Sequence, residues 1–160
     1  MSADELPDTT PRLRAGRVLR VRETACDVWC DGAVASVAFA PMFPSPRVER
    51  VSPGHLVAVA TRVDGREVVV WRWYDAVVVG HESDGSVRLW EPAHGEIAAT
   101  PRAGYRPQEP GARAYASAGL PGADWWVAEA VGSADAVPAV DLDEVGAFCS
   151  RHGLWSAAFG

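Results

Sequence analysis

Residues 66–100 read REVVVWRWYDAVVVGHESDGSVRLWEPAHGEIAAT and decide the fold class of this chain. Valine, tryptophan and tyrosine fill two runs, 66–80 and 86–91, and a shorter run follows at 95–100. β-Branched and aromatic residues in short runs are typical of strands. Asp84–Gly85 separates the first two runs, and Asp-Gly suits the two-residue turn of a hairpin because such turns need positive φ. The stretch therefore predicts three sequential antiparallel strands.

The same signals continue on both sides of this stretch. Asp31–Gly32 and Asp64–Gly65 also separate runs of strand-forming residues and predict two more hairpins. Many short strands joined by tight turns favour an antiparallel meander closed into a small β-barrel, because closure removes exposed strand edges. We therefore expect an all-β fold. Its six further strands are expected at residues 16–23, 26–30, 33–40, 55–62, 112–117 and 124–131.

One helix is expected near the C-terminal end, over about 141–152. Asp141 and Glu144 give it an acidic start, and Gly153 follows as a helix-ending residue. A helix of about three turns is not stable alone, so its apolar stripe is expected to pack on the barrel. The stripe recurs at helical spacing and consists of Leu142, Val145, Phe148 and Cys149.

The 160 residues, 48% of them hydrophobic, suffice for one stable core. Polar residues 1–11 are expected to form a disordered tail, and residues 12–160 a single barrel domain with the C-terminal helix. The alternative is two fused sub-barrels, about 12–45 and 53–131. Residues 41–54 contain four prolines, cannot be a central strand, and form either a crossover between the sub-barrels or a rim loop.

The charge balance disfavours nucleic acid as a partner. The chain has 15 basic and 21 acidic side chains and a formal charge of -6, so its overall field repels polyanions. No run approaches the roughly 18 apolar residues that a membrane span needs. The N-terminus is acidic where a signal peptide is basic, so a cytoplasmic location is expected.

Residues 53–102 resemble an SH3-like or Tudor-like small β-barrel. Their pattern is a glycine, an apolar strand, a turn, an aromatic strand with Trp-Tyr-x-Ala-x-Val at 73–78, an Asp-Gly turn and two more strands. The segment from GRVLRV to the proline-rich loop is similar to the start of an oligonucleotide/oligosaccharide-binding (OB) barrel. The Tudor-like resemblance implies an aromatic pocket for a methylated cation or a peptide. Its walls would be Trp71, Trp73, Tyr74 and Trp90.

Seven tryptophans are the most prominent feature of the composition. Trp71 and Trp73 share one face of a strand by its period of two, and the Asp84–Gly85 hairpin brings Trp90 within cross-strand reach. The turn after Trp90 then lies at a barrel rim. The expected ligand-binding site consists of Trp71, Trp73, Trp90, Glu91, His94 and Glu96. The alternative is that the aromatic residues fill the barrel core.

The turn from Glu91 to Glu96 is also the best place for acid–base chemistry, because two carboxylates flank His94 there. If the protein is an enzyme, the catalytic candidates are Tyr74, Asp75, His94 and Glu96. The sequence contains none of the usual nucleophile-elbow, zinc-protease, phosphate-loop or dinucleotide motifs. A rim histidine contributes little to a core, so replacing His94 with alanine is expected to leave the melting temperature nearly unaltered.

Five arginines within eleven residues form a basic stripe on the first expected strand. Four of them share a face of an extended strand and are a weak candidate for anion binding: Arg12, Arg14, Arg20 and Arg22. The alternative is a solvated face on which they pair with Glu23, Asp27, Asp31 or the acidic tail.

The three cysteines do not form the framework of a small secreted domain. In an extended strand Cys26 and Cys30 would lie roughly 13 Å apart, too far for a disulfide. A zinc site that joins both to Cys149 and His152 can be drawn, but buried cysteine is common in cores. Neither a metal nor another cofactor is predicted.

Three functions are compatible with these features. The preferred hypothesis is a non-catalytic binding or adaptor module that recognises a protein or peptide partner through an aromatic surface. The first alternative is a small pocket enzyme, cyclase-like or isomerase-like, that acts on an organic molecule. The second alternative is nucleic-acid binding through the first-strand arginines. The oligomeric state cannot be derived from the sequence.

Overall fold

The computed structural model describes residues 11–41, 43, 50–101, 105–118, 125–129 and 142–159. These residues form nine strands and two C-terminal helices. The strands are β1 (Arg12–Val21), β2 (Ala25–Cys30), β3 (Ala33–Phe39), β4 (Leu56–Thr61), β5 (Glu67–His81), β6 (Val87–Glu91), β7 (Gly95–Pro101), β8 (Arg113–Ala118) and β9 (Trp125–Glu129). The helices are α1 (Leu142–Arg151) and α2 (Leu154–Phe159).

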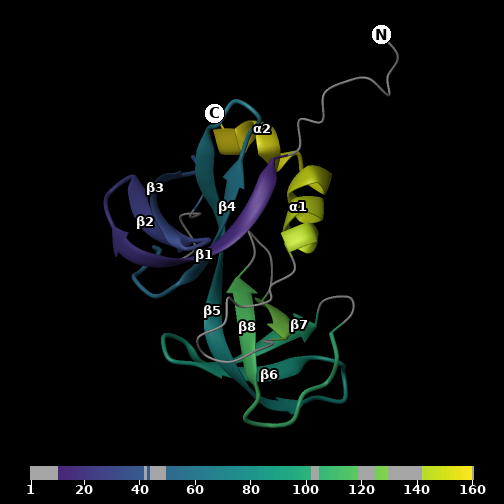
Figure 1. Ribbon diagram of the computed structural model, residues 1–160. Coiled ribbons are helices and arrows are strands. Elements are labelled where there is room, and N and C mark those ends of the chain that lie inside the picture. Colours follow the sequence, from purple (N-terminus) through teal and green to yellow (C-terminus); the bar gives the residue numbers. More distant parts are fainter. Residues whose placement is uncertain are drawn as a thin grey trace.

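The strands close into two rings that share β5. In the first ring β1 pairs with both β2 and β4, β2 with β3, and β4 with β5, all antiparallel. A parallel pairing of β3 with β5 closes this ring. The second ring contains β5, β6, β7, β9 and β8, and the parallel pairing of β7 with β9 completes it. Figure 1 shows β5 running from one lobe of the molecule into the other.

Both rings have the same strand order. Counted along the chain within each ring, the order is first, second, third, fifth, fourth, and back to the first. The third and fifth strands form the parallel pair in both rings. The expected all-β barrel with a C-terminal helix is therefore confirmed, but the strands do not follow a simple meander. The division of the chain into domains stays a prediction.

The strand order also bears on the resemblance of residues 53–102 to SH3-like or Tudor-like barrels. This stretch contains β4 to β7, and it forms no ring of its own because β4 pairs with β1 and β7 pairs with β9. The structure gives no support to that likeness.

Three tight turns match the Asp-Gly pairs. Asp31 and Gly32 have φ values of 51° and 82°, as a two-residue hairpin turn between β2 and β3 requires. Gly65 and Gly85 also adopt positive φ, at 88° and 92°. Glycine is favoured there because it has no Cβ to oppose this conformation.

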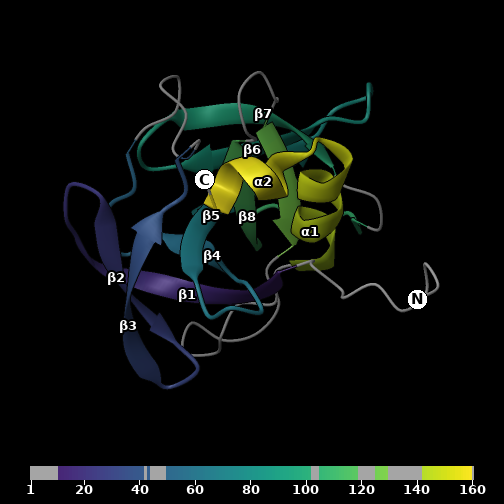
Figure 2. The same ribbon diagram turned by 90° about the horizontal axis from the view of Figure 1, so that it is seen from above.

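The helices pack on the first ring. Phe148 of α1 contacts the indole of Trp71 edge-to-face at 5.4 Å, and Gly146 lies against Leu13 of β1. Gly153, with a φ of 62°, ends α1 as predicted. The second helix, α2, was not predicted, and its Phe159 lies under the guanidinium groups of Arg62 and Arg66. Figure 2 shows both helices over the strands when the molecule is seen from above.

Several predictions concern residues outside those described. They are the tail at 1–10, most of the proline-rich loop at 42–49, and Asp141 at the helix start. Among the described helices, none is long and apolar enough to cross a membrane.

Candidate functional site

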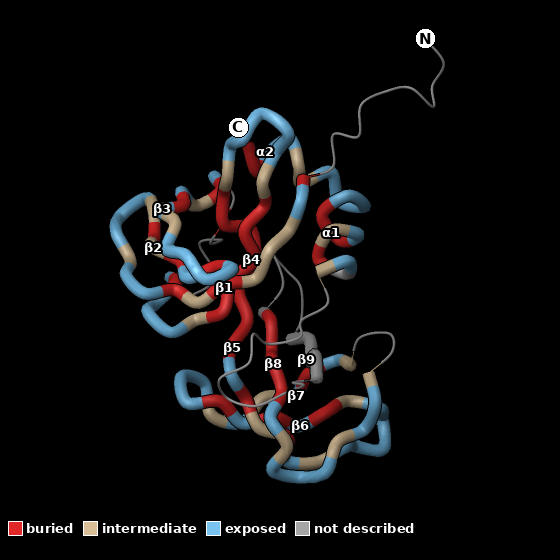
Figure 3. The backbone as a smooth tube through the Cα atoms, viewed as in Figure 1, coloured by how far each residue is buried: buried red, intermediate tan, exposed pale blue. Residues whose placement is uncertain are grey.

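The two tryptophans predicted to line a pocket lie in the core instead. Trp71 and Trp73 are both buried and belong to the main hydrophobic cluster of the first ring. Arg72 and Tyr74, which alternate with them on β5, are buried as well. Figure 3 shows the buried stretch of β5 where the two rings meet. Because this strand is covered on both faces, its period of two does not separate a core face from a binding face.

Trp90 lies apart from those tryptophans, on the outer face of the second ring. Its residue is 46% exposed, and its cross-strand neighbours are Val77 on β5 and Glu96 on β7. Glu96 accepts a contact from Arg88 Nε at 3.2 Å, and the same nitrogen lies 2.9 Å from Glu82. Glu96 is therefore a surface carboxylate that shares the guanidinium of Arg88 with Glu82.

Glu91 and His94 do come together, as the turn predicted. Glu91 is only 2% exposed, and its carboxylate accepts the Ala93 N–H at 3.0 Å and a hydrogen bond from His94 Nδ1. With the proton on Nδ1, the neutral imidazole carries its basic lone pair on Nε2. The His94 side chain is 27% exposed. The pair thus combines a buried carboxylate with an oriented imidazole that solvent can reach.

Tyr74 connects this pair to the first ring. Its ring contacts His94 edge-to-face at 5.2 Å and His55 edge-to-face at 5.1 Å. The guanidinium of Arg72 lies 4.5 Å from the centre of the same ring, and its Nη1 donates to the Arg50 carbonyl at 3.2 Å. The Tyr74 ring and the Arg50 carbonyl thus stabilise the buried guanidinium of Arg72. We call Glu91, His94, Tyr74, His55 and Arg72 the junction cluster.

The sequence did not indicate His55 or Arg72 as members of this cluster. His55 lies between the proline-rich loop and β4, with Nδ1 accepting the Ser52 N–H at 3.0 Å. Only the pairing of β4 with β5 brings it beside Tyr74, and no local motif encodes that contact.

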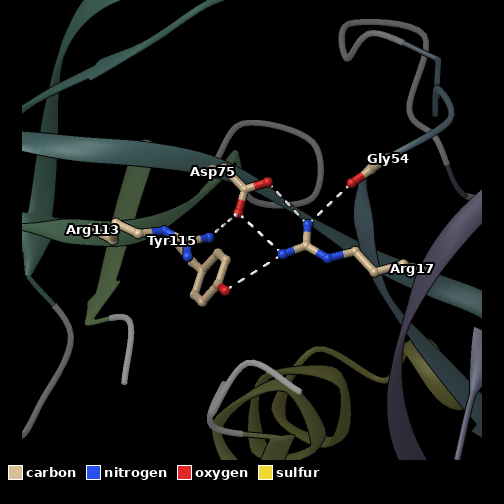
Figure 4. A network of polar contacts seen from close by, with 5 residues as sticks. All are labelled: Arg17, Gly54, Asp75, Arg113 and Tyr115. Carbon is tan, nitrogen blue, oxygen red and sulfur yellow. Dashed lines mark hydrogen bonds and ion pairs between the residues drawn. The ribbon is translucent and has the colours of Figure 1, made fainter. Parts of the chain in front are cut away.

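Asp75, the remaining catalytic candidate, belongs to a different network that Figure 4 shows in close-up. Arg17 Nη1 and Nη2 donate to its two carboxylate oxygens at 3.0 and 3.2 Å, and Arg113 lies 3.7 Å away. Arg17 also donates to the Gly54 carbonyl at 3.0 Å and reaches the Tyr115 hydroxyl at 3.5 Å. Burial raises the pKa of Tyr115. The network ties β1 to β5 and β8 and leaves Asp75 neutralised by two guanidinium groups.

The basic stripe is largely neutralised too. Arg14 pairs with Glu67 and, at 3.5 Å, with Asp31. Arg22 donates to both carboxylate oxygens of Asp27 at 2.7 and 2.8 Å. Arg12 and Arg20 are exposed and make no ion pair among the described residues. A bulge between Val18 and Arg20 shifts the strand register, so the four arginines do not form one continuous face.

A second exposed tryptophan, missed in the sequence, mirrors Trp90 in the first ring. Trp29 on β2 is 47% exposed and precedes Cys30, which forms the last β2–β3 pair with Ala33. Trp90 on β6 precedes Glu91, which forms the last β6–β7 pair with Gly95. Both tryptophans therefore stand at the same position of the second strand of their ring. The sequence signal for this match is a tryptophan that is separated from the following turn by one residue.

The apolar surface around Trp29 is extended by its neighbours. Val34 lies directly opposite it on β3 and is 55% exposed. Leu19, at the bulge of the adjacent β1, is exposed as well. Exposed aromatic and aliphatic side chains on neighbouring strands mark a candidate interaction surface.

The cysteines are buried free thiols in the structure. Burial raises the pKa of Cys26 and of Cys149 to about 11. Among the described residues, no group of three or more His, Cys, Asp or Glu side chains is arranged to hold a metal ion.

The chain matches no protein-family model and no curated protein.

Proposed function

We propose that the protein is a non-catalytic binding module that recognises a protein or peptide partner through Trp29 and Trp90. The observation that carries this proposal is the repetition: two rings of one strand order present a half-exposed tryptophan at the same position. Tryptophan is enriched among the residues that dominate binding energy at interfaces, because its large rigid surface is desolvated at little entropic cost. Two such residues on β-sheet faces provide anchors for a partner.

The surroundings of the two tryptophans differ, and the difference suggests what each would contact. Trp29 lies opposite the exposed Val34 on β3, which favours an apolar side chain of the partner on that side, and opposite Arg17 on β1. Trp90 lies beside Glu96 and Arg88, which favours a partner with polar groups next to its apolar anchor. The partner would thus combine apolar and polar contacts, as protein surfaces generally do.

The experiment is a selection from a random peptide library on the immobilised protein, followed by titration of the enriched peptides. We expect Trp29→Ala or Trp90→Ala to weaken binding at least tenfold, since losing an anchor costs more than about 1.4 kcal/mol. Val63→Ala is the matched control, because Val63 is an exposed aliphatic residue in a turn distant in sequence from both tryptophans. Unchanged affinity of both tryptophan variants, or no enriched peptide, would contradict the proposal.

A second candidate function, acid–base chemistry on a small organic molecule, is favoured by the hydrogen bond between Glu91 and His94. A buried carboxylate that fixes the tautomer of an imidazole is how enzymes orient a general base. Native mass spectrometry of the purified protein would detect a retained organic molecule. A molecule that stays bound in the wild type and is lost in His94→Gln would favour this function over the binding module.

A further inference from the structure

Among the described strands, none pairs with the outer edge of β3 over its first five residues. From Ala33 to Ala38 β3 pairs with β2 on one side, whereas on the other side β5 pairs only with Ala38 and Phe39. Ala40 continues that contact by donating to the Val69 carbonyl. Within the described part of the chain, no strand lies on the outer side of residues 33–37. Figure 2 shows the β2–β3 hairpin projecting from one side of the molecule.

The hairpin turn determines which main-chain groups this edge presents. Because Asp31–Gly32 is a two-residue turn, Cys30 and Ala33 exchange hydrogen bonds, and bonded pairs then alternate with non-bonded pairs along β2 and β3. Ala33, Ala35 and Val37 direct their N–H and C=O groups towards β2. Val34 and Ser36 direct theirs away from it. The edge therefore offers two donors and two acceptors to another strand.

These groups are complementary to a second copy of themselves. If two copies of residues 33–37 lie antiparallel with Ala35 on the two-fold axis, Val34 of each copy faces Ser36 of the other. Each such pair exchanges two N–H···O=C bonds, so the pairing makes four. The two Ala35 residues form the close non-bonded pair at the centre, where small side chains fit. Such an arrangement is isologous and closes on itself, as a two-fold dimer requires.

The edge is short, but it lacks the charged and proline residues that commonly keep sheet edges apart. Residues 33–37 read AVASV and contain no charge and no proline, the two devices that most often block edge-to-edge pairing. A strand of the same sequence therefore meets no like charge. Asp27, which lies opposite Ser36 on β2, is already held by Arg22. Arg22 also donates to Ser36 Oγ at 3.0 Å, so its aliphatic stem can cover Val34 of a second copy.

We propose that the β3 edge is a self-association surface, through which two copies of the chain join their sheets as β2–β3–β3–β2. The open part of the β3 edge lies between the Asp31–Gly32 turn and the residues that pair with β5. It therefore accepts a strand of about the length that residues 33–37 provide. A five-residue overlap buries less than stable interfaces do, so the dimer is reversible and forms at high protein concentration. This inference does not rest on either tryptophan binding a partner.

The experiment is sedimentation equilibrium over about a hundredfold range of concentration, which separates monomer from dimer by mass action. We expect the average mass to rise from 17.1 kDa towards twice that value in the wild type. Val34→Lys leaves the hydrogen bonds between β2 and β3 intact and places a charge on the open edge of β3. This variant should keep the average mass at the monomer value. Val63→Lys adds the same charge on an exposed turn and should behave as the wild type. A monomer at every concentration overturns the proposal, as does a dimer that Val34→Lys leaves unchanged.

Amide hydrogen exchange at the same concentrations locates the contact without any substitution. The amides of Val34 and Ser36 should become slower to exchange as the dimer forms, while that of Ala35, already bonded to β2, should not change. Concentration-dependent protection elsewhere, with none at Val34 and Ser36, would assign self-association to another surface. Trp90→Ala, expected to weaken peptide binding, should leave both the mass and these exchange rates unaltered, so the two proposals can fail separately.

Discussion

The hydrogen bond between Glu91 and His94 gives the sharpest test of the junction cluster. Replacing His94 with alanine leaves the buried carboxylate of Glu91 with one of the two hydrogen-bond donors that the described residues give it, the Ala93 N–H. Leaving a buried polar group unsatisfied costs about 1–3 kcal/mol, and more when the group is charged. The loss of the edge-to-face contact with Tyr74 adds about 0.5–1.5 kcal/mol. We therefore expect His94→Ala to lower the free energy of unfolding by about 2–4 kcal/mol. This replaces the sequence-based expectation that His94 contributes little to stability.

A double-mutant cycle isolates the hydrogen bond from the packing of the imidazole. Glu91→Gln keeps the shape of the side chain and removes its charge, and it is measured alone and together with His94→Ala by urea unfolding at pH 7. The double variant should be less destabilised than the sum of the single variants by about 1–2 kcal/mol, because residues in direct contact are not additive. Glu96→Gln, at the second residue of β7, is the matched control. Its exposed carboxylate pairs with Arg88, and such pairs contribute about 0–1 kcal/mol.

Two results would refute this reasoning. A His94→Ala variant within about 0.5 kcal/mol of the wild type would mean that the buried carboxylate of Glu91 is satisfied without the imidazole. Strict additivity of the two substitutions would mean that the side chains do not interact in the folded protein.

Three further predictions concern the helix, the thiols and the arginines. Phe148→Ala should lower the free energy of unfolding by about 3–5 kcal/mol, because Phe148 is buried against Trp71, and a loss below about 1 kcal/mol in denaturant melts would contradict the docking of α1. Burial raises the pKa of Cys26 and Cys149 to about 11, so these thiols ionise first in the unfolded chain. The free energy of unfolding should be constant below about pH 9 and fall by about 2 kcal/mol per thiol as the pH rises to 11. The fall should be shallower in Cys149→Ala, and a free energy of unfolding that does not change with pH would contradict the prediction. Fluorescence anisotropy with single-stranded and duplex oligonucleotides should show no micromolar binding at about 150 mM salt, and such binding, lost on changing Arg20 to Glu, would show that the stripe binds phosphate.

The strands could be predicted from the local sequence because runs of β-branched and aromatic residues alternate with residues that favour turns. Every predicted strand is present, although the first begins at Arg12 instead of residue 16, and the helix predicted over 141–152 is found as Leu142–Arg151. The order of the strands was not predictable in the same way. The pairing of β1 with β4 and of β3 with β5 joins residues far apart in the sequence, and nothing in a local period of two specifies which distant strands meet.

The candidate site was predictable only where it is local. Glu91 and His94 are three residues apart, so the turn itself brings them together. Trp71 and Trp73 were assigned to a ligand-binding site because a period of two places them on one face of a strand. β5 crosses both rings, however, and all four residues from Trp71 to Tyr74 are buried. A buried arginine is unexpected from sequence, and it is stabilised here by the Tyr74 ring and the Arg50 carbonyl.

The repeated strand order went unnoticed in the sequence because equivalent positions solve the same packing problem with different chemistry. After the exposed tryptophan, the next residue points into the ring, and it is Cys30 in one ring and Glu91 in the other. A buried thiol needs no hydrogen-bond donor, so the two-residue Asp31–Gly32 turn can follow Cys30 directly. A buried carboxylate does need donors, and the turn after Glu91 has three residues, of which Ala93 and His94 supply them. The residue type and the turn length therefore differ together between the two rings, while the tryptophan stands at the same place in both. The two rings therefore share their strand order and an exposed tryptophan, and the residues that follow the tryptophan differ with the donors that each buried side chain needs.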